Sequence, residues 1–130
     1  MDCIFCKIIN GQEPAYKVYE NERFLAFLDT KPVNPGHLLI VPKNHVGYIF
    51  DLDNGDYQEI FSVAKYLSGP LQKATQAKRI GIAIEGFGID HIHLHLVPVN
   101  HAGELDPNRA KSLGSDELTN TATQIRKCIG

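Results

Sequence analysis

The strongest constraint on the fold is the run HIHLHLV at residues 91–97, in which histidine alternates with an apolar residue. This alternation has the period of a β-strand, whose successive side chains point to opposite faces. A strand here places the imidazoles of His91, His93 and His95 on one face and the apolar side chains on the other. The apolar face predicts that the strand is anchored in a hydrophobic core.

The other strands are indicated by β-branched and aromatic residues between turn signals. Residues 17–20 and 24–28 flank a polar turn and predict an antiparallel hairpin. A loop with two prolines and a glycine leads into residues 37–41, which predict a buried third strand. Residues 79–85 and 91–99 have the pattern of extended segments and predict a second hairpin.

Two helices are predicted from apolar residues spaced three or four apart. The first spans Asn54 to Ala74, and Gly69-Pro70 is a point at which it can kink. The last helix is expected to have Ser115 as its cap. The residues expected to face the core are Ile60, Ala64, Leu67 and Leu71 in the first helix and Leu118, Ala122, Ile125 and Ile129 in the second.

Together these elements predict an α+β fold, a mainly antiparallel sheet with one long covering helix and a short C-terminal helix. A chain of 130 residues has the size of one domain. We expect a single domain over residues 1–130, with a core over about residues 1–100 and a tail and helix over residues 101–130.

Composition narrows the range of partners. A net charge of −2 provides no basic field for a nucleic-acid backbone, so nucleic acid is not an expected partner. The N-terminus lacks the pattern of a secretion signal and no apolar run reaches membrane length, so we expect a cytoplasmic protein without membrane contact. Three cysteines, two of them in Cys3-x-x-Cys6, argue against a disulfide framework.

Three histidines on one strand face favour chemistry over a purely structural role. Imidazole can act as a nucleophile, a proton carrier or a metal ligand near neutral pH. Neighbouring rings on one face lie about 6.5–7 Å apart, close enough to share an anion or a metal. From the residues alone, a metal carrier that holds zinc or copper on His91, His93 and His95 therefore stays open.

At this point the sequence closely resembles the histidine-triad family of nucleotide hydrolases and transferases. The triad itself carries the resemblance, together with the opening residues 3–9, residues 18–29 and residues 35–45, in the same order as in the family. The resemblance covers roughly the first 100 residues and does not include the tail. It implies the family fold, a homodimer and a purine nucleotide as substrate.

The family's chemistry implies roles for particular residues. His93 matches the family's nucleophile, which attacks an α-phosphorus and forms a nucleotidyl-histidine intermediate. His95 then stabilises charge on the phosphoryl oxygens, and His37 supports the hydrogen-bond network of the site. Phe27, Leu28 and Asp29 match the nucleotide-binding segment, with Asp29 on the ribose hydroxyls.

The family likeness also implies a metal. Cys3 and Cys6 with His45 and His91 match the zinc ligands of one branch of the family, and two thiolates with two imidazoles make a closed tetrahedral site. We expect a structural zinc that pins the N-terminal segment to the triad. A redox pair at Cys3-x-x-Cys6 and a pair of unliganded thiols are the alternatives.

The sequence departs from the family just before the triad. Many members have a glutamine and a serine in this stretch, whereas residues 85–90 read EGFGID here and contain neither. Asp90 adds negative charge, which disfavours long polyphosphates if it faces the site. The favoured substrates are therefore nucleoside monophosphates with an amide, ester or acyl leaving group, and a zinc-stabilised nucleotide-binding or interaction module without turnover is the alternative function.

Overall fold

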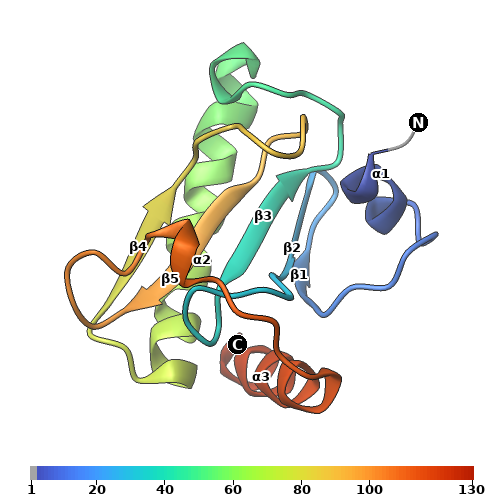
Figure 1. Ribbon diagram of the computed structural model, residues 1–130. Coiled ribbons are helices and arrows are strands. Elements are labelled where there is room, and N and C mark those ends of the chain that lie inside the picture. Colours follow the sequence, from blue (N-terminus) through green and yellow to red (C-terminus); the bar gives the residue numbers. More distant parts are fainter. Residues whose placement is uncertain (1–2) are drawn as a thin grey trace.

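The computed structural model describes residues 3–130, and its centre is a five-stranded sheet. Every neighbouring pair of strands is antiparallel, and the strand order is β1-β2-β3-β5-β4 (Figure 1). The predicted α+β class is confirmed. The strands are β1 (Lys17–Glu20), β2 (Phe24–Leu28), β3 (Leu38–Pro42), β4 (Arg79–Ala83) and β5 (Leu94–Val99).

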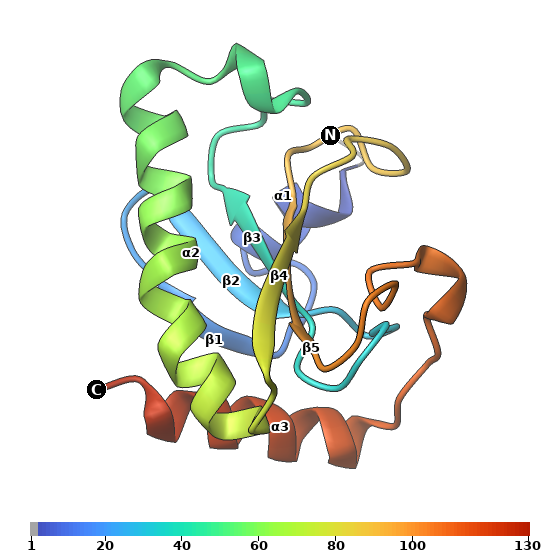
Figure 2. The ribbon, with the colours of Figure 1, turned by 90° about the vertical axis from the view of Figure 1, so that its left-hand side faces the viewer.

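The long helix α2 (Asn54–Thr75) covers one face of the sheet (Figure 2). Asp53 begins it, because its carboxylate accepts a hydrogen bond from the Asp56 N–H at 2.8 Å. The helix continues through Gly69 and Pro70 and ends before Gln76, which has a left-handed backbone. The four residues predicted to face the core in this helix are all buried there.

The C-terminal helix α3 (Ser115–Cys128) packs beside α2 and β1. The expectation that Ser115 caps this helix is wrong. Gly114 holds the cap position, and no side chain caps the helix. Ser115 already lies in the first helical turn, so its hydroxyl is past the position from which it could accept from the helix's free N–H groups.

A short helix that the sequence analysis missed, α1 (Ile4–Ile9), lies on the other face of the sheet. Phe5 and Ile8 pack against side chains that alternate with those of the main core: Leu25, Phe27, Leu39 and Val41. The 3-10 helices η1 (Ile49–Asp51) and η2 (Pro107–Arg109) complete the elements, and η2 also lies on the side opposite α2 (Figure 2). Both faces of the sheet are therefore partly covered.

The histidine segment is less regular than predicted. The strand was expected over residues 91–99, but β5 begins at Leu94, so His91 and His93 precede it. The Ile92 N–H donates to the Val46 carbonyl at 2.8 Å, which ties this stretch to the loop after β3 and not to a strand ladder. Likewise β4 ends at Ala83 and not at Glu85, and β3 begins one residue after His37.

No helix among residues 3–130 is long and apolar enough to span a bilayer.

Candidate active site and metal centre

His93 lies beside Phe5, with its ring pinned by the backbone. Its Nδ1 lies 2.8 Å from the carbonyl oxygen of His91. A carbonyl can only accept, so Nδ1 carries the proton and donates, and Nε2 keeps its lone pair. The side chain is 9% exposed, and the His93 and His95 ring centroids are 5.0 Å apart. This geometry leaves a nitrogen lone pair available as a nucleophile.

A second chain of hydrogen bonds fixes His37 and His95. The Val33 N–H donates to Nδ1 of His37 at 3.2 Å, so the proton of the neutral His37 ring sits on Nε2. That Nε2–H donates to Nδ1 of His95 at 2.8 Å, which leaves the proton of His95 on its own Nε2. His95 therefore presents an N–H donor on the side of the ring away from His37.

Burial keeps these rings neutral. It lowers the pKa of His37 to about 4, opposed by the Asp29 carboxylate and assisted by His95. Oδ2 of Asp29 lies 3.7 Å from Nε2 of His37. Burial also lowers the pKa of His95, and the neighbouring His93 adds to the effect, while Asp29 and Glu85 oppose it. The hydrogen-bond directions derived above thus hold at neutral pH.

The four residues expected to bind metal converge on one point. Cys3 and Cys6 lie one turn apart at the start of α1, His45 follows β3, and His91 is fully buried. Nε2 of His91 lies 2.8 Å from the carbonyl oxygen of Pro42 and donates to it, so Nδ1 keeps its lone pair. That lone pair faces the other three residues.

The spacing of the four donor atoms fits a tetrahedral ion. Usual zinc bond lengths put a sulfur and a nitrogen ligand about 3.6 Å apart and two nitrogen ligands about 3.4 Å apart. Nδ1 of His91 lies 3.5 Å from Sγ of Cys3 and 3.6 Å from Sγ of Cys6. Nδ1 of His45 lies 3.2 Å from Nδ1 of His91 and 3.2 Å from Sγ of Cys6. This group of residues can therefore hold a metal.

Two cavities meet at His93 and His95. The first, of about 350 Å³, lies between α1 and the sheet, and Ile8, Phe27 and Leu39 line it. The second, of about 380 Å³, lies on the other side of the histidines and is lined by His37 and the tail. Asp29 borders both cavities.

Phe27 and Leu28 contribute differently to the first cavity. Phe27 belongs to the apolar cluster on the α1 face, whereas Leu28 belongs to the main core under α2. Successive strand residues point to opposite faces, so only Phe27 directs its side chain to this side of the sheet. Asp90 borders neither cavity. It lies against Gly47 so closely that a β-carbon there would overlap its carboxylate.

Sequence reasoning missed the groups that set the proton positions. They are the backbone atoms of Val33, Pro42 and His91, for which no side-chain signal exists. It also missed Phe5, whose ring centroid lies 5.8 Å from that of His91 and 5.3 Å from that of His93. Only the apolar character of the segment after Cys3 could have hinted at a packing role for this residue.

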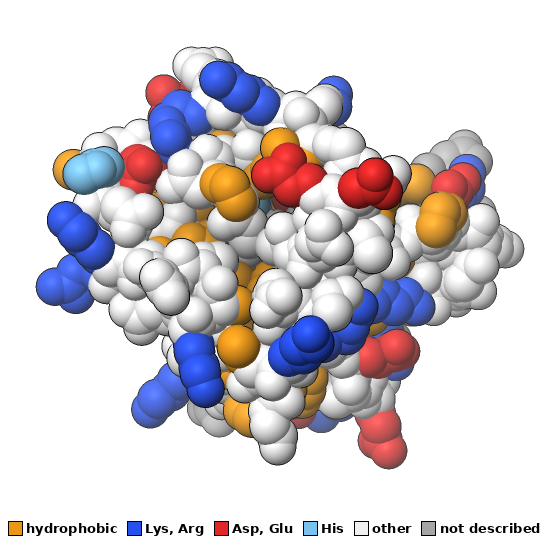
Figure 3. All heavy atoms as spheres, turned by 90° about the horizontal axis from the view of Figure 1, so that it is seen from below, with side chains coloured by type: hydrophobic (Ala, Val, Ile, Leu, Met, Phe, Trp, Pro, Cys, Tyr) orange, Lys and Arg blue, Asp and Glu red, His pale blue; other side chains and the backbone are white. Residues whose placement is uncertain are grey.

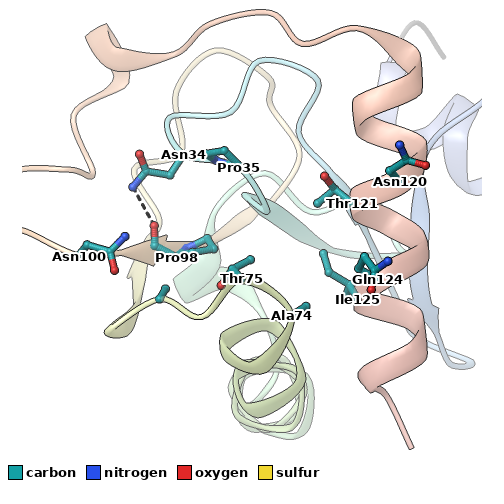
Figure 4. Close-up of a pocket in the computed structure, with 11 residues that line it drawn as sticks. Asn34, Pro35, Ala74, Thr75, Pro98, Asn100, Asn120, Thr121, Gln124 and Ile125 are labelled. Atoms are coloured by element: carbon teal, nitrogen blue, oxygen red, sulfur yellow. Dashed lines mark hydrogen bonds between the residues drawn. The ribbon is translucent and has the colours of Figure 1, made fainter.

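A further hollow of about 410 Å³ lies away from the histidines, between the end of α2, α3 and β5 (Figure 4). Seen from below, apolar side chains lie in the middle of this face and charged ones lie mostly toward its edge (Figure 3). The lining side chains are uncharged, and Asn34 is already engaged, because its amide donates to the Pro98 carbonyl at 2.8 Å. The hollow provides none of the groups needed for phosphate chemistry.

Two proteins with named activities are similar to this chain over most of its length. The adenylylsulfatase HINT3 of Arabidopsis thaliana is 31% identical over an alignment of 133 positions, gaps included, and the alignment covers 98% of this chain and 68% of that protein. The adenosine 5'-monophosphoramidase hnt1 of Schizosaccharomyces pombe is 33% identical over 117 residues, which cover 88% of this chain and 81% of that protein.

A solved structure and a family match agree with these relatives. The zinc-bound histidine triad family protein from Mycobacterium smegmatis has a TM-score of 0.85 and 28% identity, covering 99% of this chain and 94% of that one. The HIT domain family matches residues 10–102, which include all three histidines of the triad. By these matches and by its fold, the chain belongs to the HIT domain family.

Proposed function

We propose that this protein hydrolyses conjugates of purine nucleoside monophosphates at the α-phosphorus, through a nucleotidyl-histidine intermediate on His93. One observation carries the proposal. The Nε2 lone pair of His93 is left free by the bond from Nδ1 to the His91 carbonyl, and the ring borders two cavities that can hold the two halves of a conjugate.

The first cavity suits the nucleoside. Its apolar lining, with Ile8, Phe27 and Leu39, fits the faces of a purine ring. Asp29 lies at the end of the first cavity, next to the histidines. Its carboxylate can accept hydrogen bonds from the ribose hydroxyls there. A nucleoside held in this way puts its 5'-phosphorus beside His93.

In the first step, the Nε2 lone pair of His93 forms a bond to phosphorus and the bond from phosphorus to the leaving group breaks. The leaving group keeps that electron pair and takes a proton from solvent. In the second step, water attacks phosphorus, the bond to Nε2 breaks, and a proton returns to solvent. The products are the nucleoside monophosphate and the protonated leaving group.

His95 and His37 support this displacement. His95 turns an N–H donor away from His37, and a donor fixed in place stabilises a phosphoryl oxygen without reorganisation. His37 is a positioning residue in this scheme, because its donated proton fixes which nitrogen of His95 is a donor.

Cys3, Cys6, His45 and His91 would hold a structural zinc ion, which matches their donor types and spacing. When bound, the ion supplies a fixed four-point link between α1 and the triad segment and takes no part in the chemistry. The convergence of four ligands also disfavours a redox role for the two cysteines, although Cys3 does begin a helix. The zinc-bound relative supports this assignment.

The relatives support the substrate class. Their names identify one as an adenylylsulfatase and the other as an adenosine 5'-monophosphoramidase. Both names specify adenosine monophosphate joined to a second group through phosphorus. The same class suits a site in which one cavity holds a nucleoside and a second lies beyond the phosphorus.

The decisive experiment compares His93→Asn with the wild type on an adenosine 5'-phosphoramidate. We expect kcat/KM to fall by roughly 10⁴-fold or more, because the attacking atom is gone, while adenosine monophosphate still binds. The same substitution at the exposed His101 is the matched control and should leave turnover unchanged. Wild-type enzyme quenched in alkaline denaturant should also carry labelled adenylate on histidine, because the bond from phosphorus to imidazole survives base but hydrolyses in acid.

Two outcomes would refute the proposal. Equal turnover by His93→Asn would show that His93 is not the nucleophile. Adenosine monophosphate binding without turnover by the wild type would make the protein a nucleotide-binding module.

We also propose that the protein forms a homodimer, as the family likeness implies. β4 is an edge strand, and its Ile82 is 44% exposed. Phe50, in η1 before α2, is 66% exposed, so a second apolar side chain is also uncovered. Sedimentation of the purified chain should give the mass of two copies, and a monomer at micromolar concentration would refute this proposal.

A further inference from the structure

The second cavity beside the triad has no assigned occupant. It borders His93 and His95 on the side away from the nucleoside slot. Its volume of about 380 Å³ is enough for a ring-sized group. This inference rests on the proposed function, in which the group beyond the phosphorus is the leaving group. The chemistry of this cavity therefore affects which conjugates are hydrolysed.

The outer wall of the cavity comes from the tail, the stretch between β5 and α3. Leu105, Pro107 and Ala110 line it. They lie beyond residue 102, where the match to the HIT domain family ends. The wall therefore lies outside the residues that the HIT domain family match covers.

Hydrogen bonds hold this tail in place. The Arg109 guanidinium donates to the Val33 carbonyl at 3.1 Å and to Oδ1 of Asn34 at 3.0 Å. Asn34 in turn is tied to β5 through its bond to the Pro98 carbonyl (Figure 4). The Lys111 N–H donates to the Pro32 carbonyl at 3.1 Å. These hydrogen bonds therefore fix the tail against the loop before β3.

Leu105 also packs against the sheet. It lies against Gly81 of β4, where a β-carbon would be 3.3 Å from its nearest methyl group. A larger residue at position 81 would push this side chain and move the wall. The position of Leu105 is therefore set from both the tail and the sheet.

The cavity is mainly apolar around the histidines. Val33, Ala83, Val97, Leu105, Pro107 and Ala110 contribute apolar side chains. Its charged residues are Asp29, Glu85 and Lys31, so carboxylates outnumber the single ammonium group. Such a chamber disfavours an anionic occupant and favours an uncharged one with apolar surface.

We propose that this tail-walled cavity is a leaving-group chamber that selects uncharged, apolar leaving groups, with Leu105 as a specificity-determining residue. Binding energy from such a group adds to transition-state stabilisation, because the group stays in the chamber while its bond to phosphorus breaks. The inference rests on the proposed function and adds the substrate preference to it.

The test uses three adenosine 5'-phosphoramidates that share the nucleoside and differ in the amine: unsubstituted, N-benzyl and N-carboxymethyl. For the wild type, we expect kcat/KM to be highest for N-benzyl and lowest for the anionic N-carboxymethyl amide. In Leu105→Asn, a polar residue of similar size replaces the apolar wall. The ratio of kcat/KM for N-benzyl to that for the unsubstituted amide should fall roughly tenfold.

The matched control is Asn108→Ala, because Asn108 lies on the same tail but does not line the cavity. Its ratio should equal that of the wild type. Ala110→Trp is a second variant, at an exposed position, that fills the chamber and should lower the same ratio without depending on the folding of Leu105→Asn.

The outcomes separate the two proposals. Wild-type turnover of all three amides with an unchanged ratio in both wall variants would overturn the chamber and leave the proposed function standing. The absence of wild-type turnover on every amide would overturn the proposed function, and the chamber with it.

Discussion

His91 and His93 are two residues apart, and a hydrogen bond to a backbone carbonyl fixes each ring. The two rings nevertheless leave different nitrogens free. His91 donates from Nε2 to the Pro42 carbonyl and keeps the Nδ1 lone pair. His93 donates from Nδ1 to the His91 carbonyl and keeps the Nε2 lone pair. The first lone pair faces two cysteines and His45, the group that can hold a metal, and the second ring borders two cavities.

The difference shows that residue type alone does not decide what a histidine does. A backbone carbonyl chooses the protonated nitrogen, and the surroundings of the other nitrogen decide between binding a metal and attacking a substrate. Substitutions in the metal group and substitutions beside the triad both test this comparison.

The largest effect is expected in the group that can hold a metal. Cys6→Ser should abolish binding of the proposed zinc and lower the free energy of unfolding by at least about 3 kcal/mol, because metal binding to the native state alone stabilises it. Metal analysis with urea unfolding measures both. Cys128→Ser is the matched control, since Cys128 lies in α3 away from the group, and it should change neither. Equal zinc content in Cys6→Ser and the wild type would disprove this ligand set.

The second effect concerns the stability of the protein in acid, which depends on the buried His37 beside the triad. The pKa of His37 falls from 6.5 when unfolded to about 4 in the fold, so between these values the unfolded chain binds a proton that the native state does not. Stability is full above pH 6.5 and should drop by about 3 kcal/mol as pH falls to 4.

Urea unfolding at a series of pH values measures this loss. The groups facing His37 are Asp29, which opposes the shift, and His95, which adds to it. In His37→Gln, the fall between pH 6.5 and 4 should be shallower. A wild-type curve that is flat over this range would contradict a neutral, buried His37.

The third effect is kinetic. His37→Asn should lower kcat about 10- to 100-fold, as for partners that orient a working group, because nothing then fixes the proton of His95. His37→Gln carries an N–H closer to the place of Nε2 and should recover part of the loss. If both variants had the same kcat, orientation of His95 would not be the role of His37.

The smallest effect tests whether packing couples the metal group at His91 to the cavities at His93. Phe5 contacts the rings of both His91 and His93. Phe5→Leu should cost about 1 kcal/mol of stability and change kcat only two- to threefold, because a large apolar side chain still fills the space. Thermal unfolding and steady-state kinetics check this. A loss of kcat as large as that of His37→Asn would mean that the ring sets the position of the nucleophile.

Much of the fold was predictable because it follows from periodicity. Alternation predicted β5, and spacings of three and four predicted α2 with its buried Ile60 and Leu67. Periodicity could not reveal α1, since six residues are too few to show it. It also could not show that His91 leaves the ladder, because that depends on a bond between Ile92 and the loop at Val46.

The site was predictable only in part. Family likeness named the residues that the fold brings together, His37, His93 and His95 at one place and Cys3 and Cys6 with their histidines at another. The protonated nitrogen of each ring depends on backbone atoms that come close only in three dimensions. The same holds for the tail, since nothing in the sequence around Arg109 indicates that it binds the loop at Val33.

The carbonyl of His91 belongs to the main chain, and every amino acid supplies one. Exchanging residue 91 for another can empty the metal group, yet an acceptor for the Nδ1–H of His93 is still present two positions upstream. What the bond cannot tolerate is a change in the count of residues between the two. Insertion or deletion at Ile92 would turn Nε2 of His93 elsewhere, so the length of this short stretch is under tighter constraint than its composition.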